Sequence, residues 1–253
     1  MPPANPRRPC PTSAPDPQAT TVSYEGGLSA AGLFHGRGRA AFASGMVADG
    51  TWRDGLLEGD AAVYRWPGAV YEGEVAAGRR HGAGAMALDG SAAVYEGKWA
   101  GGLRHGRGAL SLTSNAHARA AGEWAHDMKQ GWGVMVYPSG NVYAGQWAAD
   151  EKHGLGAIAW HTSGQAYAGE WARGAPHGLG EYTWEQDAAP GGSHATCLMH
   201  NRYRGQFVGG RRHGEGALLY LSGARYEGSW VHGRKEGEGL YVFEDGTVFE
   251  GRF

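Results

Sequence analysis

Apolar and polar residues alternate along short stretches of the chain, and residues 143–160 show the pattern clearly. In YAGQW, at 143–147, a period of two places the Tyr, Gly and Trp on one face and the Ala and Gln on the other. A turn is expected within 148–153, and the alternation resumes in GLGAIAW at 154–160. Two such stretches joined by a short turn indicate a β-hairpin.

The same pair of motifs recurs along the chain at a nearly constant spacing. The anchor glycine of Tyr-x-Gly-x-Trp recurs in steps of 23 to 25 residues, with one step of 36, at Gly26, Gly50, Gly73, Gly97, Gly122, Gly145, Gly169, Gly205, Gly228 and Gly251. The first glycine of a His-Gly-x-Gly motif follows nine residues later in eight repeats and ten residues later in the first. Two motifs locked together in this way predict a tandem-repeat architecture.

These tandem motifs resemble the MORN repeat (membrane occupation and recognition nexus), and the resemblance covers the chain from about Val22 onward. Three stretches, SYEGGLSAAGLFHGRGRAAF, KQGWGVMVYPSGNVYAGQW and YRGQFVGGRRHGEGALLYLSGARYEGSW, resemble in that order the ciliary MORN proteins of the radial spoke head. Repeat two departs from the motif with LEGD at 57–60, and Ala120 takes a Tyr position. These departures are expected to weaken individual hairpins.

The predicted fold is all-β, an elongated single twisted antiparallel sheet of tandem hairpins with about nine and a half repeats. At roughly 4.8 Å per strand, nineteen strands predict a sheet on the order of 90 Å long. Glycines on the aromatic face are expected to leave gaps in which rings of neighbouring strands lie flat. The array occupies residues 22–253, with an insertion loop at about 185–202 that either makes a peripheral contact or has no role. Residues 1–21 hold seven of the eleven prolines and are predicted to be a disordered arm.

Composition and charge narrow the range of functions. A net charge of −2 and a pI near 6.6 give no overall field that would attract nucleic acid or an anionic membrane. The sequence has no apolar run long enough for a membrane span or for the core of a signal peptide. Its two cysteines, Cys10 and Cys197, form no disulfide framework and are typical of a reducing compartment.

No residue set predicts catalysis, a cofactor or a metal site. A catalytic histidine is needed once, in one geometry, whereas six histidines share one repeat position, which indicates an architectural role: His35, His81, His105, His153, His177 and His213. His194, Cys197 and His200 have a spacing compatible with zinc ligands, but no fourth ligand is evident. The glycine motifs match no nucleotide-binding fingerprint. Because the repeats run to the final residue, no room for a catalytic domain is expected.

An aromatic stripe is the first candidate partner site. The 10 Trp and 12 Tyr exceed what one sheet layer is expected to cover, so an exposed stripe is predicted to bind a partner protein. Its members are Tyr95, Trp99, Trp124, Tyr143, Trp147, Tyr167, Trp171 and Tyr203. The alternative is that the rings close over the glycines and bury one another.

A basic edge at the hairpin tips is the second candidate. Its members are Arg79, Arg80, Arg104, Arg211 and Arg212, and it is a possible site for an acidic protein tail or for phosphoinositide headgroups. Alternatively, these charges only keep a sheet edge soluble and free of other sheets.

The last stretch, FEGRF at 249–253, matches the first strand of a tenth repeat. Phe249, Gly251 and Phe253 are expected on one face of an unpaired edge that pairs with a second copy or with another MORN sheet. The resemblance implies a non-enzymatic scaffold of the ciliary or flagellar axoneme in contact with other axonemal and radial spoke proteins. The alternative is a phosphoinositide-binding membrane adaptor that acts through the basic edge, although membrane binding is not favoured.

Overall fold

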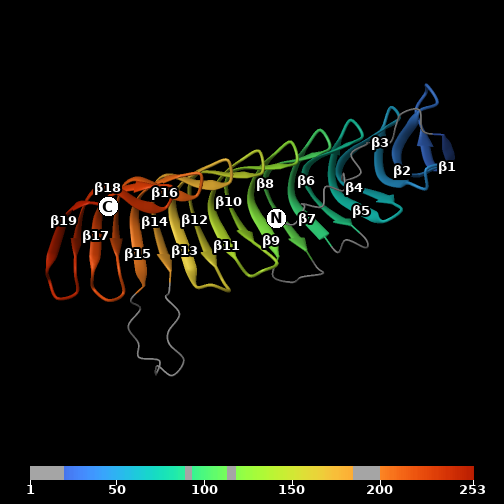
Figure 1. Ribbon diagram of the computed structural model, residues 1–253. Coiled ribbons are helices and arrows are strands. Elements are labelled where there is room, and N and C mark those ends of the chain that lie inside the picture. The colour runs from blue at the N-terminus through green and yellow to red at the C-terminus, as the bar shows by residue number, and fades with distance from the viewer. Residues whose placement is uncertain (1–19, 89–92, 113–117, 185–199) are drawn as a thin grey trace, which may run out of the picture. The chain divides into compact units, whose positions relative to one another are not determined.

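The computed structural model describes residues 20–88, 93–112, 118–184 and 200–253. Every regular element in these ranges is a β-strand (Figure 1), which confirms the predicted all-β class. The chain divides into two compact units, Met1–Met128 and Lys129–Phe253, which we call the first and second units. None of the described residues belongs to a helix that is long and apolar enough to span a membrane.

Nine strands of the first unit form an open antiparallel sheet in which each strand pairs with the next. They are β1 (Thr21–Leu28), β2 (Phe34–Phe42), β3 (Val47–Arg53), β4 (Leu56–Trp66), β5 (Ala69–Ala76), β6 (Arg79–Leu88), β7 (Ala93–Ala100), β8 (Leu103–Leu112) and β9 (Arg119–Ala125).

The second unit repeats this arrangement, with each strand again antiparallel to the next. Its strands are β10 (Met128–Val136), β11 (Val142–Ala148), β12 (Glu151–Trp160), β13 (Gln165–Ala172), β14 (Ala175–Trp184), β15 (Asn201–Val208), β16 (Arg211–Leu219), β17 (Arg225–Val231), β18 (Arg234–Val242) and β19 (Val248–Arg252). The predicted antiparallel sheet of tandem hairpins is therefore confirmed.

The hairpin turns are tighter than predicted. β11 reverses into β12 through Ala149 and Asp150, whose φ angles of 49° and 70° are left-handed. A two-residue turn with both central φ angles positive matches the twist of the flanking strands. The turn expected over residues 148–153 therefore takes only two residues, and Glu151 already belongs to the return strand.

The N-terminal boundary of the array also differs from the expected one. Thr21 begins β1 and pairs with Phe42, and the Thr20 carbonyl accepts the N–H of Ala43 at 2.9 Å. These backbone hydrogen bonds bring Thr21 into the sheet and out of the arm predicted for residues 1–21. The rest of that arm, residues 1–19, lies outside the described residues.

The insertion ends earlier than expected. Asn201 and Arg202 belong to β15, and the buried Asn201 accepts the N–H of Leu221 at its Oδ1, at 3.0 Å. The expected loop at 185–202 is therefore shorter at its C-terminal end. Residues 185–199, which include two of the three residues considered for zinc, lie outside the described residues.

One face of each sheet carries the core, built from Tyr rings that cover glycines. The Tyr143 side chain is fully buried, and its ring lies so close to Gly156 that a Cβ there would overlap the ring, whereas a Cβ on Gly145 would overlap the Gly156 backbone and the Tyr143 hydroxyl. Its hydroxyl donates a hydrogen bond to the Gln146 carbonyl at 2.8 Å. The glycines therefore provide the gaps for aromatic rings that the sequence predicts.

Candidate functional site

The aromatic face is a series of rings in edge-to-face contact. In the second unit, the Tyr143 ring centroid lies 4.9 Å from that of Trp147 and 5.3 Å from that of Trp171, with interplanar angles of 81° and 85°. Trp171 Nε1 donates a hydrogen bond to the Gly156 carbonyl at 2.9 Å. Tyr143 is thus held between the Trp of its own repeat and the Trp of the next, and such edge-to-face contacts add to the stabilisation from buried apolar area.

The predicted exposed stripe is wrong in its premise, because all its members are buried. Side-chain exposure is at most 6% for Tyr95, Trp99, Trp124, Tyr143, Trp147, Tyr167, Trp171 and Tyr203. The number of rings does not determine their exposure, since rings standing edge-on to one another over glycines cover each other without a second sheet layer. These residues form the core of the array, and no contact in the structure tests whether a partner reaches them.

Basic side chains complete the cover over these rings. They occupy six of the eight positions that lie seven residues after the anchor glycines of repeats two to nine. We call these the lid positions: Leu57, Arg80, Arg104, Lys129, Lys152, Pro176, Arg212 and Lys235. Lys152 Nζ lies 4.5 Å from the Trp171 ring centroid and 5.5 Å from that of Tyr143. Burial lowers the pKa of the Lys152 ammonium. The ring faces attract this cation through their quadrupoles.

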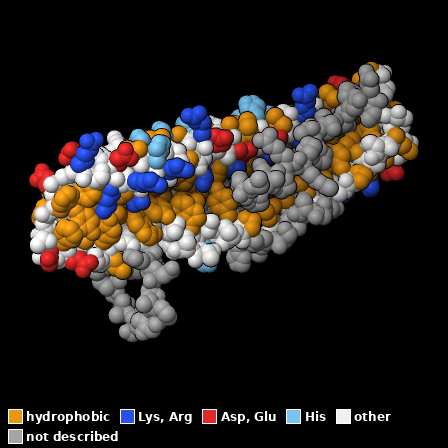
Figure 2. Space-filling model, viewed as in Figure 1, with side chains coloured by type: hydrophobic (Ala, Val, Ile, Leu, Met, Phe, Trp, Pro, Cys, Tyr) orange, Lys and Arg blue, Asp and Glu red, His pale blue; other side chains and the backbone are white. Residues whose placement is uncertain are grey.

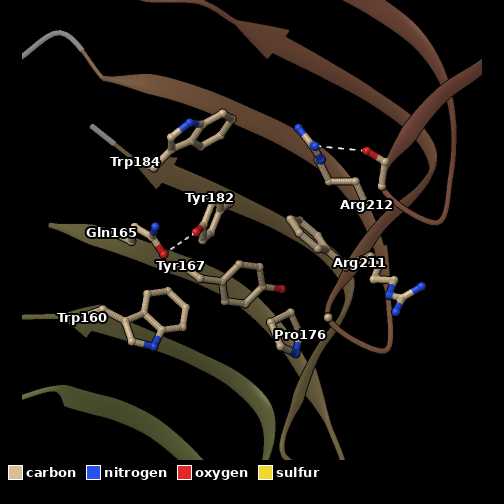
Figure 3. Close-up of a pocket in the computed structure, with 11 residues that line it drawn as sticks. Trp160, Gln165, Tyr167, Pro176, Tyr182, Trp184, Arg211 and Arg212 are labelled. Carbon is tan, nitrogen blue, oxygen red and sulfur yellow. Dashed lines mark hydrogen bonds between the residues drawn. The ribbon is translucent and has the colours of Figure 1, made fainter. Parts of the chain in front are cut away.

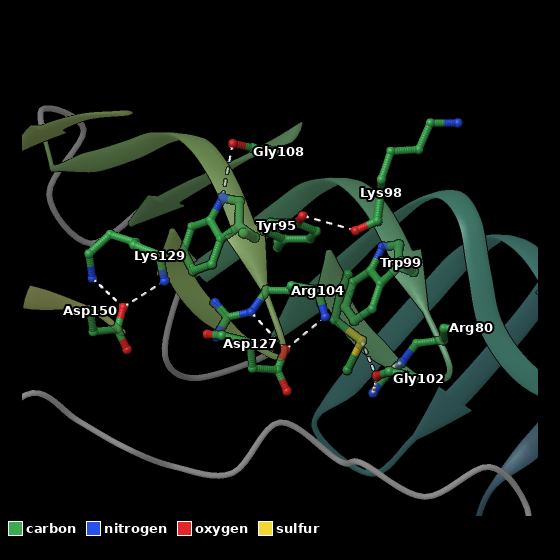
Figure 4. Close-up of polar contacts among 12 residues, drawn as sticks. Arg80, Tyr95, Lys98, Trp99, Gly102, Arg104, Gly108, Asp127, Lys129 and Asp150 are labelled. Carbon is green, nitrogen blue, oxygen red and sulfur yellow. Dashed lines mark hydrogen bonds and ion pairs between the residues drawn. The ribbon is translucent and has the colours of Figure 1, made fainter. Parts of the chain in front are cut away.

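Hydrogen bonds hold several lid residues in place (Figure 4). In the first unit, Arg104 donates from Nε to Asp127 Oδ1 at 3.0 Å and from Nη2 to the Asp127 carbonyl at 2.7 Å. Arg80 is 4% exposed and donates from Nη2 to the Gly102 carbonyl at 2.6 Å. In the second unit, Lys129 Nζ contacts Asp150 Oδ1 at 2.7 Å. These lids are therefore fixed parts of the fold.

The predicted basic edge is divided by this arrangement. Arg80, Arg104 and Arg212 turn toward the rings, whereas Arg79 and Arg211 remain exposed. The reason is the period of two, which sends neighbouring residues of one strand to opposite faces. Figure 2 shows Lys and Arg side chains beside a band of hydrophobic side chains on the face turned to the viewer. The five arginines therefore do not form one edge.

A cleft opens on the aromatic face of the second unit around Pro176. It has a volume of about 660 Å³, and its lining includes Trp160, Tyr167, Pro176, Tyr182, Trp184 and Phe207 (Figure 3). Tyr182 Oη contacts Gln165 Oε1 at 2.6 Å, which fixes one wall. Sequence reasoning missed this cleft, although a proline at a position that is basic in most other repeats was visible in the chain.

The MORN-repeat family model matches nine segments, which together cover well over half of the chain: residues 24–47, 49–59, 71–86, 95–115, 121–142, 143–164, 167–186, 203–225 and 226–248. The chain belongs to the MORN-repeat family. It is a non-enzymatic repeat scaffold for protein or membrane interactions. A solved structure, the TCP10 domain of Danio rerio CPAP in complex with a peptide of Danio rerio STIL, aligns with 91% of this chain and 100% of that chain. Its identity is 10% and its TM-score 0.40, a likeness that carries no argument about function.

Two of the repeated MORN histidines contact a histidine of the next hairpin tip, which is an architectural role. His105 and His213 make ring contacts with His126 and His232, at centroid distances of 5.9 Å and 5.5 Å, and both contacts join consecutive hairpin tips. Within the described ranges, no group of three His, Cys, Asp or Glu side chains is placed to hold a metal ion.

The opposite face of the second MORN unit carries the exposed apolar side chains. Trp132, Leu155 and Leu179 are 55%, 56% and 61% exposed and occupy the same position in three consecutive repeats. Trp132 pairs with Gln146, and Leu155 pairs with Glu170, so a polar side chain on the intervening strand separates each member of the row from the next. We call these three residues the outer apolar row. The signal was present in the sequence as a large apolar residue between the two glycines of the motif in repeats five to seven, which read QGWG, HGLG and HGLG.

The C-terminal residues considered for pairing lie on one face of β19. The ring centroids of Phe249 and Phe253 are 5.4 Å apart, and Phe253 also contacts Tyr226 at 4.8 Å. Phe249 is 46% exposed and Phe253 36%, with Gly251 between them. Pairing of this edge with another chain stays a prediction, since no contact in the structure tests it.

Proposed function

We propose that this MORN chain is a structural component of the ciliary or flagellar axoneme, within the radial spoke and its head. The observation that carries the proposal is the order of three stretches, SYEGGLSAAGLFHGRGRAAF, KQGWGVMVYPSGNVYAGQW and YRGQFVGGRRHGEGALLYLSGARYEGSW, which resemble radial spoke head 10 homologue B, a ciliary MORN protein. The partners would be other axonemal and radial spoke proteins. The repeat scaffold supports this role because each fixed ring-and-lid unit presents similar surfaces along the chain.

The outer apolar row is the surface that best supports protein contact. Its three side chains are exposed, whereas the rings first considered for this role are core. Apolar side chains that recur at the same repeat position on one face offer a partner protein regularly spaced contacts. Binding through this row would bury Trp132, and Trp is frequent among residues that dominate interface energies.

Fractionation of a ciliated cell that expresses the tagged full chain tests the proposal. After detergent extraction, we expect the wild-type chain to remain in the demembranated axoneme. A triple variant, Trp132→Ser with Leu155→Ser and Leu179→Ser, should be released, because its contact surface is lost while the buried face is untouched. Circular dichroism of the purified variant checks that it is folded.

Release of the wild-type chain with the membrane fraction would refute the axonemal proposal and favour the membrane adaptor. The membrane adaptor would have to act through basic side chains that are exposed, such as those of Arg79 and Arg211. Sedimentation with phosphoinositide-containing liposomes at physiological salt then provides the check. Binding that is lost in Arg79→Ala with Arg211→Ala would support the adaptor.

A further inference from the structure

The lid positions follow a rule that one repeat of the second unit breaks. Six of the eight lid residues are basic, and each has its charged group within 6.0 Å of one or more ring centroids: Arg80, Arg104, Lys129, Lys152, Arg212 and Lys235. Leu57 in repeat two is fully buried and fills its own place. Pro176 in repeat seven leaves the cleft on the aromatic face.

The rings around the cleft match those of a cage that holds a cation elsewhere in the same unit. Lys235 Nζ lies 4.5–5.8 Å from the centroids of four rings, those of Tyr220, Tyr226, Tyr241 and Phe253. At the same repeat positions around Pro176 stand Trp160, Tyr167, Tyr182 and Phe207. Tyr167 and Phe207 also keep the edge-to-face contact of Tyr226 and Phe253, at 5.1 Å and 4.8 Å. The cleft is therefore a Lys235-type cage whose own residue is a proline.

A hydrogen-bond acceptor for a cation is also in place. The lid guanidinium of Arg212 donates to the carbonyl of Gly233, the turn residue whose N–H donates to the Arg212 carbonyl at 2.8 Å. Gly210 stands in the same relation to Pro176, since its N–H donates to the Pro176 carbonyl at 2.9 Å. Gly210 lines the cleft, and Pro176 has no side-chain donor to offer its carbonyl.

The charge around the cleft is compatible with one more cation. Arg211 and Arg212 both line one end of the cleft. Arg211 is exposed, and the Arg212 guanidinium donates to the Gly233 carbonyl (Figure 3). That guanidinium lies 4.4 Å from the Trp230 ring centroid and 5.9 Å from that of Trp184. Lid residues of consecutive repeats are two strands apart, or about 10 Å, a distance comparable to the screening length at physiological salt. Lys129 and Lys152 tolerate that spacing in the same unit. An anion would instead face the electron-rich faces of the rings.

We propose that the cleft at Pro176 binds the side chain of a Lys or Arg residue from a partner protein. The partner cation would lie among Trp160, Tyr167, Tyr182 and Phe207 and donate a hydrogen bond to the Gly210 carbonyl. The proposal deepens the scaffold function, since it names the chemistry that one partner contact must supply. It also explains why this cage is open while the Lys235 cage is filled by the chain itself.

Titration of the full chain with Nα-acetyl-lysine methylamide, followed through the Trp160 and Trp184 indole N–H resonances, tests the proposal. The norleucine analogue, which lacks the charge, and the glutamate analogue are the comparison ligands. We expect saturable shifts and an affinity about tenfold above that of the norleucine analogue, within the range of cation–π interactions. Equal affinities, or tighter binding of the glutamate analogue, would overturn the proposal.

Three variants sharpen the test. Pro176→Lys supplies the cation from within, so it should abolish binding and raise the melting temperature, whereas Pro176→Ala should bind as the wild type does. Lys235→Ala opens the matched cage and should add a second set of shifts at Tyr226 and Tyr241. Undiminished binding by Pro176→Lys would also overturn the proposal. The titration needs no cell, so its failure is distinguishable from failure of the axonemal role, which the fractionation alone tests.

Discussion

A single methyl group added beneath a tyrosine ring tests whether the ring needs the space that a glycine leaves. Gly156→Ala places a Cβ where the Tyr143 ring lies, and the ring cannot shift in place because Trp147 and Trp171 flank it. Overpacking of this kind costs about 1–3 kcal/mol. Complete expulsion of the ring would cost about 3–5 kcal/mol, with about 1 kcal/mol more for its hydrogen bond. We therefore expect Gly156→Ala to lower the free energy of unfolding by about 2–4 kcal/mol.

A double-mutant cycle with Tyr143→Ala isolates the cause. Gly156 does not have a positive φ, so alanine strains no backbone there. Once the ring is gone, Gly156→Ala should be neutral or should stabilise by about 0.4–1 kcal/mol through the unfolded state. The coupling free energy between the two substitutions should then be at least about 2 kcal/mol.

Urea unfolding of the full chain, monitored by circular dichroism and by tryptophan fluorescence, measures the free-energy cost of each substitution and the coupling free energy between them. Coincident curves from the two probes license a two-state treatment, which repeat arrays do not always satisfy. If the costs of the two substitutions simply add, the ring and the glycine do not compete for space. Glycine would then not be required beneath the tyrosine rings, and the packing proposed for the aromatic face would be wrong.

Two further outcomes follow from the lids and from the buried tyrosines. Arg104→Met should lower the free energy of unfolding by about 1–3 kcal/mol, because Asp127 loses the hydrogen bonds that Arg104 donates. Lys152→Met should lower it less, since burial already opposes the charge of Lys152. Urea midpoints that rank the two variants the other way would contradict this. Desolvation raises the pKa values of Tyr143, Tyr167 and Tyr203 to about 12, so the native state keeps protons that the unfolded chain releases near pH 10. Stability should therefore be unaffected by these groups below about pH 10 and fall as the pH rises from there to about 12; an ultraviolet phenolate titration in which all tyrosines titrate normally would contradict this.

The sequence predicts the strands well because the alternation is a local property. Tyr143, Gly145 and Trp147 lie on one face of β11, as their period of two requires. The reason for the glycines was also accessible, since only a residue without a Cβ leaves room for a ring beside it. The length of the turns was not, because Ala149 and Asp150 adopt positive φ without the glycine that usually signals it.

The candidate sites were harder to predict because they depend on exposure. Counting rings gave an exposed stripe, but exposure depends on the angle between rings, and an edge-on indole such as Trp171 covers its neighbour. Their place at the hairpin tips predicts Arg79 and Arg80 on one edge, but alternation along the strand sends the two side chains to opposite faces. The constant spacing between the anchor glycines and the lid residues is visible in the sequence, but that these side chains cover the rings could be seen only from the ring positions.

The tip of repeat seven departs from the basic lids of most other repeats at one position, Pro176. The backbone N–H groups of Arg104 and Lys129 donate to Asp127 and Asp150 of the next tip, each at 2.9 Å. Pro176 has no N–H to donate, and the residue at the matching tip position is Gly210, which has no side-chain acceptor. Glycine also occupies the matching tip position opposite Arg80, Lys152 and Arg212, so the proline alone is particular to this repeat. Gly210 carries no carboxylate that would need the missing N–H. Because nothing at this tip depends on that donor, proline is compatible with the repeat, and its cage is left open to a cation supplied from outside.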